Sequence, residues 1–109
     1  MAKFEITKRK NDEFQFNLKA SNGQVILTSE GYKAKDSCKN GIESVIKNSA
    51  DDKRFKRLES KDGKPYFILS AANGEVIGTS EMYESKSGME NGIESVKKNA
   101  PAAEIVDLS

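Results

Sequence analysis

The sequence predicts an α+β fold made of two β-β-β-α repeats. The chain of 109 residues contains the same segment twice, at 4–49 and at 55–100, with no gap between the aligned copies and about 22 of 46 positions identical. Each copy opens with apolar and polar residues in alternation, the pattern of a strand with one buried face. Each copy then changes to apolar residues at helical spacing, which predicts one helix after the strands.

The size of the chain indicates one domain rather than two. Its 109 residues correspond to one ordinary domain. Each copy has only about 50 residues and few large apolar side chains, which is a marginal amount for independent folding. We therefore expect residues 1–109 to form a single domain around a shared core, with repeat one at about 3–52 and repeat two at about 53–109.

Three strands are predicted in the first copy. Phe4 and Ile6 alternate with polar residues and indicate the first strand. Residues 14–20 alternate more regularly and form the clearest strand pattern in the chain. Asn22-Gly23 is a dipeptide that tolerates positive φ at both central positions of a hairpin, so residues 24–28 are expected to return as an antiparallel partner. The same offset predicts three strands in the second copy, at residues 55–59, 66–69 and 75–79.

A helix of about 13 residues is predicted after the strands of each copy. Its apolar stripe follows the spacing i, i+3, i+4 and i+7, and consists of Cys38, Gly41, Ile42 and Val45 in the first copy and Met89, Gly92, Ile93 and Val96 in the second. Ser85 is a suitable N-cap, whereas the corresponding Ala34 cannot cap. Glycine inside a helix costs about 1 kcal/mol relative to alanine, so the two glycines on the stripe predict close packing against another element.

The C-terminal residues 104–108 align with residues 53–57, the start of the second copy. We therefore expect a short additional strand at the C-terminus. The aligned segment at 53–57 is expected to close the first repeat and open the second at once.

Three sequence motifs recur in the same order in both copies: Asn-Gly at 22–23 and 73–74, Thr-Ser-Glu-x-Tyr at 28–32 and 79–83, and Asn-Gly-Ile-Glu-Ser-Val at 40–45 and 91–96. With these motifs the chain resembles, over nearly its whole length and in tandem form, the YegP-like family of small bacterial domains. The resemblance implies that the two repeats share one antiparallel sheet with two helices packed on it. It also implies that the helices are exchanged, each packing on the other repeat, and it implies no established activity.

Composition argues against catalysis and against a broad electrostatic surface. The chain has no histidine, and its one cysteine, Cys38, has Met89 as its counterpart, which indicates a packed side chain rather than a reactive thiol. Most metal and nucleophile constellations are thereby excluded, so we expect no cofactor and no enzyme activity. The net charge of +1 argues against nucleic acid or anionic membrane as a general partner. Without a signal peptide or membrane span, a cytoplasmic location is expected.

Candidate binding residues are the glutamate and tyrosine of the Thr-Ser-Glu-x-Tyr motif and the asparagine that follows, namely Glu30, Tyr32 and Asn40, with Glu81, Tyr83 and Asn91 as their counterparts. A glutamate two residues before a tyrosine could do acid–base work inside a cleft. The interpretation we favour is structural: the motif ends a strand, its hydroxyls satisfy loop backbone, and the tyrosine anchors the approach to the helix. For the asparagines, a hydrogen bond to a neighbouring strand or loop is favoured over a ligand.

Two functions remain. The first is a non-catalytic binding or interaction module for a protein partner, monomeric with internal pseudo-twofold symmetry, in which a terminal strand such as 104–108 adds to a sheet. The alternative is weak binding of nucleic acid or anions by the aromatic and basic residues of the first copy, Phe14, Phe16, Lys8, Arg9, Lys10 and Lys19. The alternation weakens this alternative, because it places both phenylalanines on the apolar face of the strand.

Overall fold

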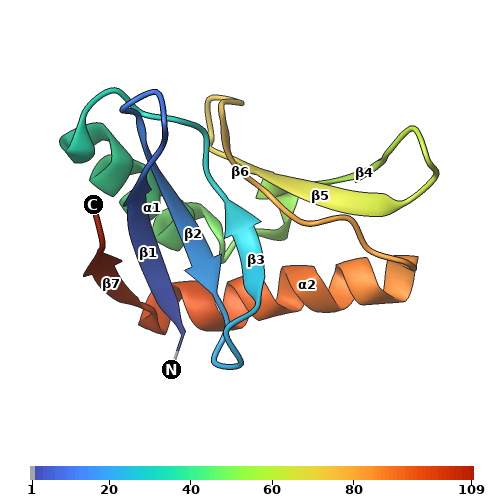
Figure 1. Cartoon of the computed structure of the whole chain (residues 1–109). Helices are drawn as coiled ribbons and strands as arrows, with labels where there is room; N and C mark the ends of the chain where they lie inside the picture. Colours follow the sequence, from blue (N-terminus) through green and yellow to red (C-terminus); the bar gives the residue numbers. More distant parts are fainter. Residues whose placement is uncertain (1) are drawn as a thin grey trace.

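The computed structural model describes residues 2–109. In it the strands of both repeats form one seven-stranded sheet, which is covered by two helices (Figure 1). Repeat one contains β1 (Lys3–Lys8), β2 (Phe14–Lys19), β3 (Val25–Thr28) and α1 (Lys35–Asn48). A short 3-10 turn then leads into repeat two, which contains β4 (Phe55–Glu59), β5 (Pro65–Ser70), β6 (Val76–Thr79), α2 (Lys86–Asn99) and β7 (Glu104–Asp107). The predicted α+β class, two-repeat order and C-terminal strand are confirmed.

The strands lie in the order β4-β5-β6-β3-β2-β1-β7. Neighbouring strands are antiparallel, as predicted, except at one edge, where β7 runs parallel to β1 and makes the sheet mixed. β4 pairs with β5 and forms the opposite edge, so among residues 2–109 it opens the second repeat without closing the first. The expectation that this segment would serve both repeats is therefore wrong.

The two halves of the sheet meet at a narrow junction. β3 and β6 are joined through a single pair of opposing residues, Thr28 and Thr79, which are counterparts in the two repeats. The pseudo-twofold axis therefore passes between them. Next to this pair, Leu27 is fully buried, and a Cβ placed on its counterpart Gly78 would lie 2.7 Å from the Leu27 Cγ. Only one of these two positions can hold a large side chain.

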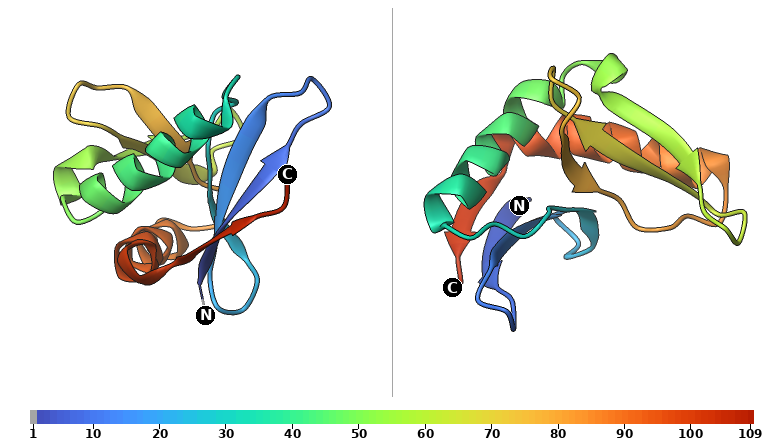
Figure 2. Two further views of the ribbon diagram at one scale, coloured as in Figure 1. Left: turned by 90° about the vertical axis from the view of Figure 1, so that its left-hand side faces the viewer. Right: turned by 90° about the horizontal axis from the view of Figure 1, so that it is seen from above.

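Each helix packs across both repeats. α1 contacts β2 of its own repeat and also β5 and β6 of the other, whereas α2 contacts its own β5 and also β3. Figure 1 shows α2 extending under both halves, and Figure 2 shows both helices on the same side of the first half of the sheet. The family resemblance implied that each helix packs on the other repeat, and in the structure each helix packs on both. The core therefore contains side chains of both repeats, including Phe16, Leu27, Ile42, Phe67 and Ile93.

The ends of the helices and hairpins follow local sequence rules, with one difference. The Gly88 N–H donates to the Ser85 Oγ at 3.0 Å and caps α2 as predicted, while Ala34 supplies no cap to α1. The Asn22-Gly23 turn has positive φ, 84°, only at the glycine. The Gly23 N–H instead donates to the Ala20 carbonyl, which gives a four-residue turn ending in a glycine bulge rather than a two-residue hairpin.

Unfolding of the chain is expected to follow one cooperative transition, because each helix is packed on strands of both repeats. Urea titrations followed by far-UV circular dichroism and by tyrosine fluorescence should give superimposable curves. A chain truncated after residue 52 should lack fixed structure at the same protein concentration. Two separate transitions in the full chain, or a folded truncated chain, would show that the repeats are independent units.

Candidate functional site

The serine of each Thr-Ser-Glu-x-Tyr motif connects two strands. Ser29 is buried; its Oγ accepts a hydrogen bond from the Phe16 N–H at 2.9 Å and donates to the Glu30 carbonyl at 2.8 Å. Ser80 makes the same two bonds, with the Phe67 N–H at 2.9 Å and the carbonyl of the next residue at 2.8 Å. The hydroxyls therefore satisfy backbone groups that would otherwise be buried without a partner, as the structural interpretation predicted.

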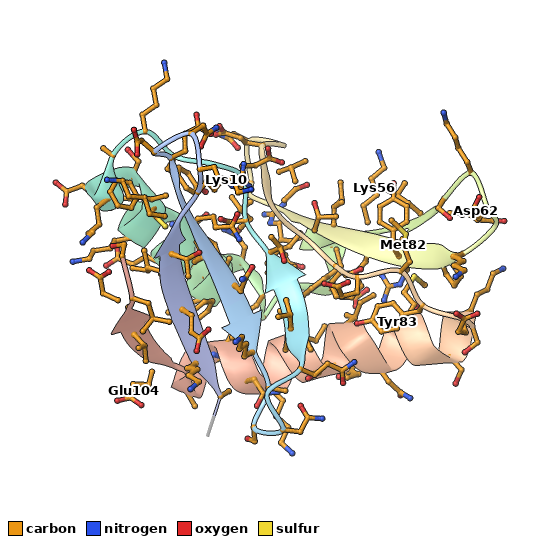
Figure 3. The ribbon with its side chains drawn as sticks, viewed as in Figure 1. Lys10, Lys56, Asp62, Met82, Tyr83 and Glu104 are labelled. Atoms are coloured by element: carbon orange, nitrogen blue, oxygen red, sulfur yellow. The ribbon has the colours of Figure 1, made fainter. Side chains whose placement is uncertain are left out.

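The tyrosine of each motif fills the space beside a helix glycine. The Tyr32 ring is stacked on Phe16, with centroids 6.4 Å apart, and a Cβ placed on Gly41 would lie 2.5 Å from the Tyr32 Oη. Tyr83 is stacked on Phe67 at 6.3 Å and meets Gly92 in the same way, between β5 and α2 (Figure 3). The predicted close packing of both helix glycines is confirmed, and the partner in each case is a tyrosine.

Three of the candidate residues, Glu30, Tyr32 and Asn40, line one cavity of about 460 Å³. One wall is α1 with the loop before it, and the other wall is the β5–β6 hairpin of the second repeat. We call this cavity the inter-repeat groove, because residues far apart in the sequence form it. Its further lining residues are Gly31, Ser37, Gly41, Ser44, Ala71, Asn73, Glu75, Val76 and Ile77.

The inter-repeat groove is polar and acidic. Two carboxylates line it, from Glu30 and Glu75, and none of its lining residues is basic. Burial raises the pKa of the Tyr32 phenol above its ordinary value, and nearby Cys38, Glu30 and Glu75 raise it further. The phenol therefore stays protonated at neutral pH and can donate a hydrogen bond.

The Asn40 amide lies in this groove without an internal partner. It is exposed and makes no hydrogen bond within residues 2–109, and the same holds for Asn91. The expectation that each asparagine would form a hydrogen bond to a neighbouring strand or loop is therefore wrong. By contrast, the helix asparagines Asn48 and Asn99 bond back to Ser44 and Ser95. The Asn40 amide remains available to donate to, or accept from, a ligand in the groove.

The counterparts in the second repeat are arranged differently. The cavity between α2 and the β2–β3 hairpin, about 400 Å³, is lined by Ala20, Ser21, Asn22, Glu94, Ser95, Lys98 and Asn99. Glu81, Tyr83 and Asn91 do not line it, and Lys98 gives it a basic group that the inter-repeat groove lacks. The two grooves are therefore related by the repeat but differ in charge.

Sequence reasoning missed the half of the groove that comes from the hairpin. Asn73 and Glu75 flank a turn glycine, so their sequence context indicates only a turn. A signal existed in the comparison of the copies, since Glu75 replaces Gln24 and is the charge that distinguishes the hairpin loop at 71–75 from the loop at 20–24. This charge difference belongs to the groove only because the hairpin packs against the helix of the other repeat.

The described residues offer little for covalent or metal chemistry. Cys38 is fully buried, and burial raises the pKa of its thiol above the ordinary value, which keeps it in the unreactive neutral form. Residues 2–109 contain no cluster of three acidic or cysteine side chains arranged to hold a metal ion. Over the same residues, neither helix is long and apolar enough to cross a bilayer.

Comparison with known families gives two adjacent matches to one family, described as a domain of unknown function (DUF1508), at residues 10–55 and 60–107. Relatives match over nearly the whole chain. A UPF0339 protein of Acinetobacter baylyi is 55% identical over 97% of this chain and 96% of its own length. A UPF0339 protein of Pseudomonas aeruginosa is 50% identical over 99% of this chain and 98% of its own length.

Two solved structures have the same fold. The solution NMR structure of a UPF0339 protein from Shewanella oneidensis has a TM-score of 0.93 and 50% identity, covering 98% of this chain and 91% of that one. The solution NMR structure of the protein of unknown function YegP from E. coli has a TM-score of 0.94 and 43% identity, covering 98% of this chain and 92% of that one. The descriptions of these relatives name no catalytic activity.

Replacement of Gly41 by leucine is expected to destabilise the fold by about 2 kcal/mol, because the new side chain would push α1 away from Tyr32 and Phe16. Urea unfolding of Gly41→Leu against the native chain measures the change. Glu43→Leu, at an exposed position of the same helix, is the matched control and should change the free energy of unfolding little. An unchanged stability in Gly41→Leu would contradict the close packing.

Removal of the Ser29 hydroxyl is expected to cost about 1–3 kcal/mol, since Ser29→Ala leaves the buried Phe16 N–H without its side-chain acceptor. Ser80→Ala should cost a similar amount because its bonds are the same. Ser21→Ala, at an exposed turn position, serves as control. Equal stability of Ser29→Ala and Ser21→Ala would refute the structural assignment of the motif.

Proposed function

The chain belongs to the DUF1508 family, and we propose that it is a non-catalytic interaction module that binds a basic side chain of a partner protein in the inter-repeat groove. One observation carries the proposal: the groove brings Glu30, Tyr32 and Asn40 of the first repeat against Asn73 and Glu75 of the second. Each repeat alone contributes only part of this set. The site therefore exists only in the assembled fold.

The chemistry of the groove suits a cation that also forms hydrogen bonds. An arginine or lysine side chain is strongly attracted by two carboxylates when no basic group competes. The guanidinium of arginine offers five donors in a planar fork, which the carboxylates of Glu30 and Glu75 and the amide oxygen of Asn40 can accept. Arginine is the better match, because the acceptors lie on two separate walls.

Support for a non-catalytic role comes from the chemistry of the same residues. Glu30 is exposed, and its motif partner Ser29 is fully engaged with backbone groups. No histidine is available as a base, and the thiol of Cys38 is buried. Nothing in this set supplies an activated nucleophile beside a general base.

The alternative of nucleic-acid binding through the first sheet has less support. Phe16 is fully buried, and Phe14 is half-buried with the ammonium groups of Lys8 and Lys35 over its ring at 5.7 Å and 5.6 Å. Neither ring offers a free face on which bases could stack.

We expect the module to act as a monomer in the cytoplasm. The tandem repeat places within one chain the two halves that a symmetric dimer would otherwise bring together. Light scattering at working concentration measures the mass of the particle.

The binding function is tested by NMR titration with acetyl-arginine-amide as a minimal probe. Amide signals of Glu30, Asn40 and Glu75 are expected to shift with the probe. The double variant Glu30→Gln with Glu75→Gln should bind on the order of tenfold more weakly, because both charges are lost while the shape is kept.

Two matched controls accompany this titration. Acetyl-citrulline-amide has nearly the shape of the probe without its charge and should produce no shifts. Glu81→Gln, the counterpart of Glu30 in the second repeat, should bind as the native chain does, because Glu81 does not line the groove. Equal response to both probes, or unchanged binding in the double variant, would refute the proposal.

A further inference from the structure

The two repeats differ in how the edge of the first strand is covered. In repeat one, β7 lies parallel along β1, with Asp107 opposite Ile6. The Leu108 N–H donates to the Ile6 carbonyl at 2.8 Å, and the Asp107 carboxylate pairs with the Lys35 ammonium at 2.8 Å at the start of α1. That ion pair holds the pKa of Asp107 well below its ordinary value. An acidic strand therefore closes this edge.

The equivalent edge in repeat two is open. β4 is the counterpart of β1, and it forms the end of the sheet over residues 2–109. Arg57 stands where Ile6 stands in the first repeat, and Lys86 stands where Lys35 stands. Lys86 is exposed and forms no ion pair within the described residues, whereas Lys35 is paired with Asp107. Among residues 2–109, nothing on the second repeat occupies the position that β7 has on the first.

The largest of the described cavities, about 710 Å³, lies at this open edge. It runs between β4, the β4–β5 hairpin and the start of α2, and it contains both Arg57 and Lys86. Its remaining lining residues are Leu58, Glu59, Gly63, Pro65, Glu84, Ser85, Met89 and Glu90. The space is thus bounded by a strand edge, a lysine at a helix start and three apolar side chains.

The backbone of β4 is oriented to accept a strand. In β1 the Ile6 carbonyl points toward β7, and in an edge strand of an antiparallel pair the N–H of the same residue points the same way. By the repeat, the N–H and carbonyl of Arg57 point outward from β4. The Phe55 N–H is already donated to the Asp52 carbonyl, and the backbone groups of Lys56 and Leu58 face β5. The outward groups left on this edge are therefore the Phe55 carbonyl and the N–H and carbonyl groups of Arg57 and Glu59.

The charges at this edge are mixed, because the lining of the cavity holds Glu59, Glu84 and Glu90 besides Arg57 and Lys86. Lys56 and Arg57 are exposed on β4, and the first repeat has Glu5 and Ile6 at these positions. Arg57 is held by Glu90 and Asp52 at 2.6 Å and 3.2 Å, and Glu84 is paired with Lys64, so Lys86 is the cation of this lining that has no ion pair within residues 2–109. Lys56 and the acidic Glu104 of β7 lie at opposite sides of the molecule (Figure 3).

We propose that the β4 edge and its cavity bind an extended segment of a partner protein that carries a carboxylate at the position of Asp107, added parallel to β4 as β7 is added to β1. The segment carries a carboxylate opposite Arg57 that pairs with Lys86, and an apolar side chain beside it that packs on Leu58, Pro65 and Met89. A second copy of this chain is not the occupant, because the β7 of each copy is already paired with its own β1. This surface is separate from the inter-repeat groove.

The test uses a synthetic peptide with the sequence of residues 103–109, since this segment already pairs with the equivalent edge. Titration into the full-length labelled chain, followed by NMR, is expected to shift the amide signals of Lys56–Glu59 and Lys86 and to leave those of β1 unchanged. Replacing the peptide's aspartate, the equivalent of Asp107, by asparagine should weaken binding on the order of tenfold, because the ion pair with Lys86 is lost.

Matched variants separate strand addition from simple charge attraction. Arg57→Pro removes the outward N–H without touching the β5 side of the ladder, which an edge strand tolerates, and it should abolish binding. Arg57→Ala removes the same ion pairs but keeps the N–H, so it should still bind. Lys86→Glu should weaken binding about tenfold, while Lys98→Glu, near the other end of α2, should not.

Any one of four peptide-binding results would overturn the proposal. They are the absence of shifts at millimolar peptide, shifts confined to β1, equal binding by Arg57→Pro and Arg57→Ala, and equal binding by Lys86→Glu and Lys98→Glu. Light scattering at the same protein concentration supplies a further check. A particle of twice the chain mass that dissociates when peptide is added would show that a second copy of this chain occupies the edge. That result would contradict the proposal that the occupant is a partner protein.

Discussion

The weak link between the two halves of the sheet determines how the rest of the molecule is built. β3 and β6 share one opposing pair, Thr28 and Thr79, so backbone hydrogen bonds across the junction contribute little. The repeats are connected instead by side chains, because each helix rests on strands of both halves. Burial of apolar surface scales with contact area, so two bridging helices stabilise the assembly more than one residue pair of sheet can. The shared core follows directly from this arrangement.

The same bridging creates the surfaces that carry chemistry. A helix that crosses from one repeat to the other must pass the hairpin of its neighbour, and the inter-repeat groove is the space left between them. Tyr32 and Gly41 set the depth of this groove, because the phenol ring occupies the place where a helix side chain would stand. Ser29 fixes the loop that carries Glu30. The structural residues of the motif thus position the polar ones.

Sequence periodicity predicts most of the fold because alternation and helical spacing are local properties. Both helices, the six strands of the two repeats and the packing of Gly41 and Gly92 follow from them. The turn at Asn22-Gly23 differs, since a bulge in the following pair changes the geometry that the dipeptide alone favours. The parallel placement of β7 depends on which edge the chain reaches after α2, and no local pattern encodes that. Glu75 belongs to the groove for a similar non-local reason.

The unequal pair Leu27 and Gly78 has a consequence for how the sequence of a tandem chain can evolve. In a symmetric assembly of two identical halves, one sequence position supplies both sides of the axis, so two leucines would collide and two glycines would leave a void. Joining the halves in one polypeptide lets the two sides mutate separately. One bulky side chain then fills the space at the axis, and glycine stands opposite it. Covalent duplication thereby opens sequence combinations that strict symmetry forbids, and the charge difference between the two grooves is another product of that freedom.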